Sequence, residues 1–220
     1  MADIEDTRER LLEATLPHVP FDGWTRSAMA AGARDLGLAP EDAALAFPGG
    51  ALEMIDLHGT LADARMVAAM AARGVADMKV RARIALGVRL RLEQNAEHRE
   101  AVRRAVAVLA LPWNAAVATR SLYRTVDAIW RAAGDTATDY NFYTKRGLLA
   151  GVYTATLLFW LDDDSEDFAE SWAFLDRRIA EVLRIPAAIN RLTARLGELP
   201  NPLLLFARGP RRPAYRSSRR

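Results

Sequence analysis

Residues 24–53 read WTRSAMAAGARDLGLAPEDAALAFPGGALE, and the order of breaks in this stretch decides the fold. Thr25 is a typical helix-capping residue and Gly37 a typical helix stop, so we predict a helix between them. Pro40 stands where a first-turn proline belongs and opens a second, short helix. Pro48-Gly49-Gly50 then breaks the chain before a long apolar helix begins. The stretch therefore predicts two short helices followed by a long one.

Helical patterns continue on both sides of this stretch. Upstream, residues 6–18 place Leu11, Leu12 and Leu16 on one stripe, as a helix that packs on a core does. Downstream, helices are predicted over residues 51–72, 78–95, 97–109, 112–133, 139–161, 165–184 and 186–199. The sequence shows neither an alternating strand pattern nor an internal repeat. We therefore predict an all-α fold of about nine or ten helices.

The composition limits the class of protein. The 220 residues are 51% hydrophobic and 26% charged, which is typical of a soluble globular chain with a sizeable core. The chain has no cysteine, which rules out disulfides, thiolate metal sites and a cysteine nucleophile. The uncharged stretch at residues 147–161 has 15 residues, and no uncharged stretch of the chain is longer. A membrane-spanning helix needs ~20, so this stretch is predicted to be a buried core helix.

An enzymatic function finds little support in the sequence. His18, His58 and His98 are scattered and lack the paired spacing of a metal site. No glycine-rich phosphate loop is present. Asp162-Asp163-Asp164 resembles a metal-binding run, but adjacent carboxylates cannot converge on one ion unaided, so we expect a solvated turn. The sequence therefore predicts no catalytic residue, no metal and no cofactor.

Charge is distributed unevenly along the chain. Residues 1–175 hold 19 Lys/Arg and 25 Asp/Glu, whereas residues 176–220 hold 11 Arg and three acids. Within the basic part, residues 185–199 are predicted to form an amphipathic helix suited to the bilayer interface, or else a helix docked on its own domain. Its membrane-binding residues are expected to be Ile185, Ile189, Arg191, Leu192, Arg195 and Leu196. The basic tail, residues 200–220, is expected to be disordered and to be attracted by an anionic surface.

Roughly residues 5–60 resemble the helix-turn-helix head of TetR-type transcription regulators. The resemblance rests on Arg8–Ala14, Gly23-Trp24-Thr25, Ala31-Gly32-Ala33, Leu36-Gly37-Leu38 and Phe47-Pro48-Gly49. A DNA-binding head neutralises phosphates with basic side chains, yet five acids and two bases lie between residues 22 and 53. The recognition-helix equivalent begins with Glu41-Asp42 and offers no side chain for base readout. We predict a degenerate head over residues 1–50, with a TetR-type ligand-responsive transcriptional regulator as the alternative function.

A more specific resemblance lies in residues 130–146, which read WRAAGDTATDYNFYTKR. Together with Leu161-Asp162, Ser165–Phe168 and Trp172–Arg178, this run resembles the signature of the coenzyme Q (ubiquinone) biosynthesis protein nine family. That family consists of TetR-like, lipid-binding accessory proteins. Phe142 departs from its pattern, because members often have Trp there. With the head included, the resemblance spans about residues 5–195.

The resemblance implies a protein without a reaction of its own. Members of this family bind isoprenoid quinone precursors and present them to a membrane-associated di-iron demethoxyubiquinone hydroxylase. An isoprenoid lipid, this hydroxylase and an anionic membrane surface are therefore the partners expected here, together with a homodimer and no nucleic acid. The acidic N-terminus lacks a presequence pattern, so we expect a bacterial cytoplasmic protein associated peripherally with the inner membrane.

Two sets of site residues are predicted within residues 51–184, the expected lipid-binding and dimerisation domain. Apolar residues at helical spacing on three successive helices would line a lipid tunnel: Leu122, Val126, Trp130, Leu148, Val152, Thr156, Trp160, Trp172, Leu175 and Ile179. For each of these residues, filling an ordinary core is the alternative. Exposed aromatics beside basic residues would bind the partner protein: Asp135, Tyr140, Asn141, Phe142, Tyr143, Lys145 and Arg146. For Tyr140 and Tyr143, packing between helices is the alternative.

Overall fold

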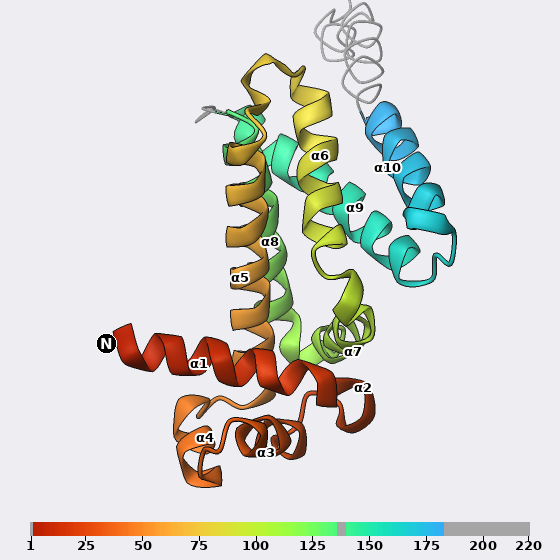
Figure 1. The fold of residues 1–220 in the computed structure, drawn as a ribbon. Helices are drawn as coiled ribbons and strands as arrows, with labels where there is room; N and C mark the ends of the chain where they lie inside the picture. The colour runs from red at the N-terminus through yellow and green to blue at the C-terminus, as the bar shows by residue number, and fades with distance from the viewer. Residues whose placement is uncertain (1, 136–139, 183–220) are drawn as a thin grey trace, which may run out of the picture. The chain divides into compact units, whose positions relative to one another are not determined.

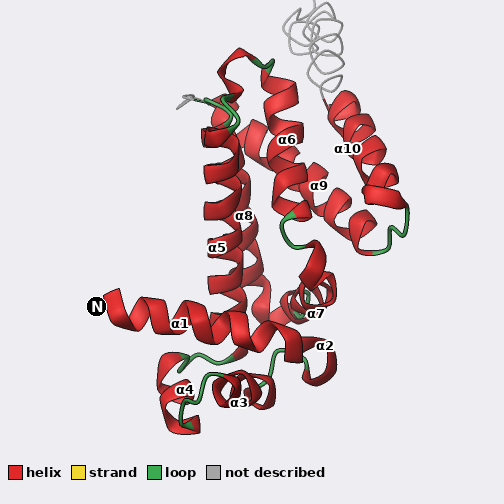
Figure 2. Ribbon diagram, in the orientation of Figure 1, coloured by secondary structure: helices red, strands yellow, loops and turns green. Residues whose placement is uncertain are grey.

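The structure, a computed structural model, describes residues 2–135 and 140–182. Within these ranges the chain forms helices and no strand, which confirms the all-α prediction (Figures 1 and 2). The α-helices are α1 (Ala2–Thr15), α2 (Val19–Asp22), α3 (Arg26–Asp35), α4 (Pro40–Ala46), α5 (Ala51–Ala72), α6 (Val80–Glu93), α7 (Arg99–Leu109), α8 (Ala115–Ala132), α9 (Tyr140–Leu161) and α10 (Ala169–Val182). The described residues up to Ile179 form one compact unit. The helix expected over residues 186–199 lies outside the described residues.

The predicted breaks of the head lie where its helices begin and end. The Ala28 amide donates to Thr25 Oγ1 at 3.3 Å, which caps the start of α3. Gly37 follows α3 with a φ of +69°, and Gly50 precedes α5 with a φ of +62°. Only glycine adopts such angles without steric cost. Pro40 is the first residue of α4, as a helix-opening proline should be.

The head encloses a core that reaches into α7. Leu11 and Leu12 of α1, Trp24 and Phe47 are buried together. The Trp24 indole donates to the carbonyl of Ala101 in α7 at 2.9 Å. Figure 1 shows α1 crossing the N-terminal end of α5, with α3 and α4 beyond it. The head is therefore packed on the following helices and is not suspended from a linker.

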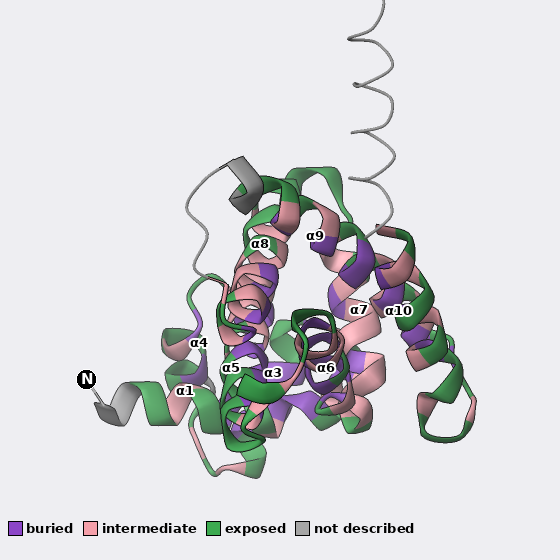
Figure 3. Cartoon of the chain, turned by 90° about the horizontal axis from the view of Figure 1, so that it is seen from above, coloured by how far each residue is buried: buried purple, intermediate pink, exposed green. Residues whose placement is uncertain are grey.

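The longer helices α5, α6, α8 and α9 pack beside one another around a second core. Met66 and Met70 of α5, Val88 of α6, and Val126 and Ile129 of α8 are almost completely buried. Figure 3 shows buried residues on the inner sides of these helices and exposed residues on their outer sides. These four helices, together with α7, surround a cavity.

A buried aspartate joins α9 to α10. Asp163 accepts hydrogen bonds from the amides of Ser165 and Ser171, each at 2.8 Å. Burial acts to raise its pKa, but the hydrogen bonds from these two serines outweigh it and lower the pKa to about 2. The neighbouring aspartates on each side are exposed and pair with arginines of α7. The expected solvated turn is therefore solvated only at its outer positions, because the middle carboxylate holds the first turn of α10.

Helix α9 is buried on one face only. Leu149, Val152 and Trp160 are buried, whereas Gly151 and Leu158 are exposed. The prediction of a buried core helix is thus right for one face of α9 and wrong for the other, because the described helices that contact α9 pack on one side of it. None of the described helices is, by itself, both long and apolar enough to cross a membrane. Two consecutive helical segments, Ala96–Leu109 and Pro112–Ala132, meet at a bend of 94°. They reach the required length and apolar character only when they are counted together.

We predict opposite effects for two glycine-to-alanine substitutions. A Cβ at Gly32 would lie 2.7 Å from the backbone nitrogen of Thr15, so Gly32→Ala must push α1 away from α3. Overpacking of this kind costs roughly 1–3 kcal/mol of unfolding free energy. Gly151→Ala meets nothing within 4 Å and should stabilise α9 by up to about 1 kcal/mol. Urea unfolding measures both, and equal stabilities for the two variants would contradict the described α1–α3 contact.

Candidate ligand-binding cavity

A cavity of about 270 Å³ lies between α5, α6, α7, α8 and α9. Half of its lining residues are aliphatic, and most of the others have polar side chains. The lining residues are Ile55, His58, Gly59, Arg91, Leu92, Asn95, Val102, Ala105, Val106, Leu109, Ala110, Ala118, Ser121, Leu122, Arg124, Thr125, Tyr153, Thr154, Leu157 and Trp160. An apolar concavity with a few polar groups is the usual form of a small-molecule site.

The apolar wall comes mainly from α7 and α8. Val102, Val106 and Leu109 recur at the three- and four-residue spacing of one helix face, and that face turns to the cavity. Ala118 and Leu122 of α8 continue this wall. No residue of α7 belongs to the tunnel predicted from the sequence. Its apolar spacing was the available signal, but spacing alone does not say which neighbour a helix faces.

The polar wall is organised by a buried carboxylate outside the lining. Asp63 of α5 accepts from Arg91 Nε of α6 at 2.7 Å and from Arg124 Nε of α8 at 3.2 Å. Thr125 Oγ1 also donates to it, at 2.9 Å. Arg124 further donates to Asp56 at 2.6 Å, and burial acts to raise the pKa of Asp56 while Arg124 and Ser121 lower it overall. The two guanidinium groups in the wall are therefore neutralised within the protein.

His58 lies on the same wall in a neutral state. Its side chain is buried, and its ring lies 5.9 Å from the ring of Trp24. Burial and, to a lesser extent, the positive charge of Arg91 lower its pKa to about 3. At neutral pH the imidazole therefore has one nitrogen that donates and one that accepts.

The structure brings together only part of the predicted lipid-binding set. Leu122 and Trp160 line the cavity. Five other members of the set are buried in the packing between helices, outside the cavity lining: Val126, Val152, Thr156, Leu175 and Ile179. Trp130, Leu148 and Trp172 are partly buried, and the indoles donate to the carbonyls of Lys145 and Asp167. The predicted tunnel through α8, α9 and α10 remains a prediction, whereas this cavity is lined by residues of α5 to α9 and by none of α10.

The predicted partner-binding residues divide into paired charges and an exposed aromatic. Arg146 is buried and pairs with Asp127 at 2.7 Å and with Asp135 at 3.3 Å. Lys145 pairs with Asp135 at 2.9 Å. Tyr143 is 70% exposed. The side chains of Tyr140, Asn141 and Phe142 lie outside the described residues. The charges thus hold α9 against α8, and Tyr143 is the member of this set that the structure places at the surface.

The predicted membrane-binding residues cannot be located in the same way. The residues outside the described ranges include the tail over residues 200–220 and Ile185, Ile189, Arg191, Leu192, Arg195 and Leu196. Their role stays a prediction from the sequence.

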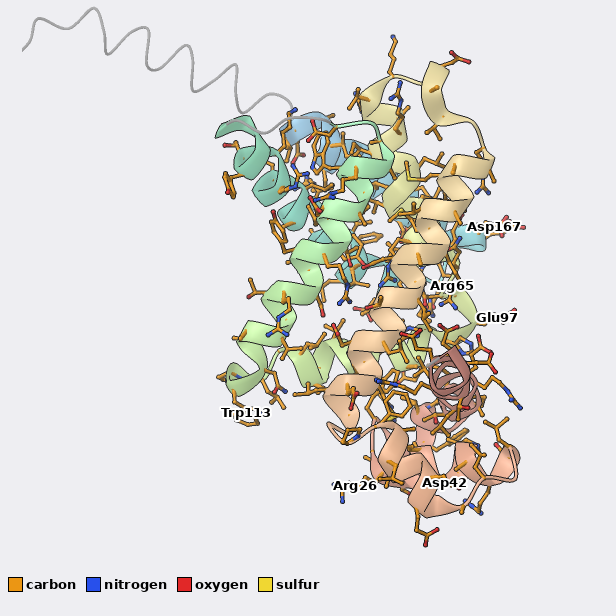
Figure 4. The ribbon with its side chains drawn as sticks, turned by 90° about the vertical axis from the view of Figure 1, so that its left-hand side faces the viewer. Arg26, Asp42, Arg65, Glu97, Trp113 and Asp167 are labelled. Atoms are coloured by element: carbon orange, nitrogen blue, oxygen red, sulfur yellow. The ribbon has the colours of Figure 1, made fainter. Side chains whose placement is uncertain are left out.

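The outer face of the head agrees with the acidic pattern of its sequence. Glu41 and Asp42 are exposed at the start of α4, and Leu45 is 78% exposed on the same helix. Figure 4 shows Arg26 and Asp42 pointing away from the head. Carboxylates at the start of this helix would meet DNA phosphates with the wrong charge, which disfavours the transcription-regulator alternative. In the described ranges, no group of three His, Asp or Glu side chains is placed to hold a metal ion.

The fold and its internal cavity define a TetR-like all-α protein. A TetR transcriptional regulator from Nitrosomonas europaea superposes with a TM-score of 0.67 at 21% identity, over 81% of this chain and 98% of that one. The COQ9 family model matches residues 115–186, and the model of the N-terminal domain of ubiquinone biosynthesis protein COQ9 matches residues 5–34. The chain belongs to the COQ9 family.

Curated relatives support this assignment along most of the chain. The mitochondrial ubiquinone biosynthesis protein COQ9 of Bos taurus is 34% identical over 82% of this chain and 59% of its own length. The Homo sapiens protein of the same name is 33% identical, with the same coverage. The chain thus spans about 60% of the length of the curated relatives it matches.

We predict that Asp63→Asn strongly destabilises the protein. The substitution leaves Arg91, whose side chain is 10% exposed, without its ionic partner. Removing one member of a buried ion pair costs roughly 3–5 kcal/mol. Glu93→Gln, which breaks the exposed Arg89–Glu93 pair, is the matched control and should cost less than about 1 kcal/mol. Chemical denaturation compares the two, and similar losses would show that Asp63 does not have this structural role.

Proposed function

We propose that this protein is a non-catalytic, lipid-binding accessory protein of ubiquinone biosynthesis that binds isoprenoid quinone precursors. The observation that supports the proposal best is the cavity, whose aliphatic residues come largely from α7 and α8 and whose arginines are electrically balanced within the protein. Such a lining suits a neutral amphiphile with a ring and an apolar chain. Membership of the COQ9 family supports a place in the same pathway as its relatives, which are named as ubiquinone biosynthesis proteins.

The size of the cavity limits what it encloses. Its volume of about 270 Å³ is slightly below the ~300–1,000 Å³ that small-molecule sites usually have. A ring with the first part of its chain fits such a space, whereas a long isoprenoid chain must extend beyond it. We therefore propose that the protein encloses the ring end of its ligand and leaves much of the tail outside the cavity.

We predict that filling the cavity abolishes lipid retention. Ala118 lies in the apolar wall and is partly buried, so Ala118→Trp places an indole inside the cavity. Ala116 is exposed on the same helix and outside the lining, so Ala116→Trp is the matched control. Purified proteins are extracted with organic solvent, and the extract is analysed by mass spectrometry. Wild type and Ala116→Trp should release an isoprenoid quinone or precursor, and Ala118→Trp should release almost none.

Two outcomes of that measurement are decisive. Equal lipid in Ala118→Trp and wild type would place the lipid elsewhere on the protein. A wild-type protein that contains no lipid and takes up no added quinone would contradict lipid binding altogether.

We further propose that the start of α9 presents the ligand to a membrane-associated di-iron demethoxyubiquinone hydroxylase. Tyr143 is 70% exposed, and the ion pairs of Lys145 and Arg146 with Asp127 and Asp135 fix the helix turn that bears it. A rigidly held, exposed aromatic is a typical anchor of a protein interface.

Tyr143→Ala should lower the affinity for the hydroxylase by about tenfold or more, as the loss of an aromatic anchor does. Tyr123→Ala is the control, because Tyr123 is 45% exposed on α8 and belongs to neither predicted site. Binding of the two purified proteins is measured by surface plasmon resonance with detergent present. Unchanged affinity in Tyr143→Ala, or equal loss in both variants, would contradict the proposed interface.

The remaining expectations concern assembly and membrane binding. Gly147, Gly151 and Leu158 form an exposed face of α9 that a second copy of the chain would cover in the expected homodimer. Sedimentation velocity tests the homodimer, since a monomer at all concentrations contradicts it.

Peripheral binding to the inner membrane rests on residues 185–220, and the absence of flotation with anionic liposomes would contradict it.

A further inference from the structure

Three buried polar atoms of the cavity wall have no hydrogen-bond partner among the described residues. They are Nε2 of His58 on α5, Oδ1 of Asn95 after α6, and Nε1 of Trp160 on α9. These residues are 5%, 1% and 0% exposed, and all three line the same cavity. Buried polar atoms are almost always paired in folded proteins, because leaving one unpaired costs free energy. Three such atoms around one cavity point to a ligand that pairs with them.

Much of the other polar wall is already engaged within the protein. Arg91, Arg124 and Thr125 bind Asp63. Ser121 donates to Asp56 at 3.1 Å. The wall therefore offers a ligand neutral hydrogen-bonding groups and no uncompensated charge from these arginines.

The chemistry of the three atoms defines what they recognise. The side-chain amide of Asn95 donates to the Arg91 carbonyl at 2.7 Å, and a carbonyl can only accept, so Oδ1 of Asn95 is an acceptor that is left unpaired. The indole nitrogen of Trp160 can only donate. The neutral His58 ring can do either at Nε2, depending on its tautomer. A complementary ligand needs an oxygen that accepts and a hydroxyl that donates.

We propose that this wall binds the ring of a phenol or quinol in preference to a quinone, with the ring at α5, α6 and α9 and the chain along α7 and α8. This inference rests on the proposed function, that the cavity holds a lipid. A ring oxygen accepts from Trp160, and a ring hydroxyl donates to Asn95. A quinone has only accepting oxygens and leaves Oδ1 of Asn95 unpaired, and a hydrocarbon leaves all three atoms unpaired.

The test compares three probes with the full-length protein, stripped of lipid, by isothermal titration calorimetry under argon. The probes are 2,3-dimethoxy-5-methyl-6-decyl-1,4-benzoquinol, the corresponding quinone and decylbenzene. Wild type should bind the quinol at least about tenfold more tightly than the quinone. Asn95→Leu should abolish this preference and leave the affinity for decylbenzene undiminished.

A matched control separates the cavity from general stability. The Asn114 side-chain amide donates to the Val108 carbonyl at 2.8 Å, and Asn114 is buried outside the cavity lining. Asn114→Leu therefore loses a similar local bond and should keep the preference for the quinol. Trp160→Phe provides a second variant should Asn95→Leu fail to fold. It should weaken quinol and quinone alike by about tenfold, because both use the indole donor, and spare decylbenzene.

The outcomes distinguish this inference from the proposed function. Equal affinity for quinol and quinone in wild type would overturn the inference, as would a preference that survives Asn95→Leu. In both cases, binding of decylbenzene would leave lipid binding intact. Failure of all three probes to bind would overturn the proposed function, and the inference with it.

Discussion

Helices α5, α6 and α8 meet around the carboxylate of Asp63, and the cavity depends on that meeting. Donors from Arg91, Arg124 and Thr125 converge on this one acceptor, which is 4% exposed. A charge at this depth is tolerated only while its partners remain in place, so the contact restricts how the three helices can shift. The same contact turns both guanidinium groups toward Asp63. A wall that contains two arginines therefore suits a neutral ring better than an anionic one.

The sequence string most specific to the COQ9 family has a comparable role at the other end of α9. Asp135 joins Lys145 and Arg146, and Asp127 joins Arg146 from α8. These ion pairs tie the chain before α9 to the helix itself and leave Tyr143 exposed. Basic residues beside aromatics suggest a binding surface, but here the charges act between helices. A partner at this surface would therefore meet the aromatic side of the turn more than its charges.

How much the sequence could predict follows from the range of each interaction. Helix boundaries depend on local chemistry, so Thr25, Gly37 and Pro40 could be placed correctly before the structure was known. Which helix faces which is a long-range property, and a face such as that of α7 looks alike whether it packs on a core or on a cavity. Asp63 shows the same limit, because an aspartate within a helix is more often solvated than buried. The aspartate run at residues 162–164 could not be resolved either, since burial of its middle carboxylate depends on amides of α10.

The two proposed sites lie far apart on one helix, and this separation constrains how a ligand could be handed over. Trp160 and Tyr143 are 17 residues apart in α9, which corresponds to about 25 Å of helix. A ring held at Trp160 therefore lies far from the side chain at which the partner would dock, so delivery at Tyr143 requires the ring to leave its hydrogen bonds. The apolar face of α7 leads away from that wall toward the junction with α8, where Leu111 is 38% and Trp113 77% exposed (Figure 4). A ligand whose chain already lies along this face can withdraw without crossing the polar wall. Release of the ring, more than docking of the partner, is then the step that the donors and acceptors of the cavity would control.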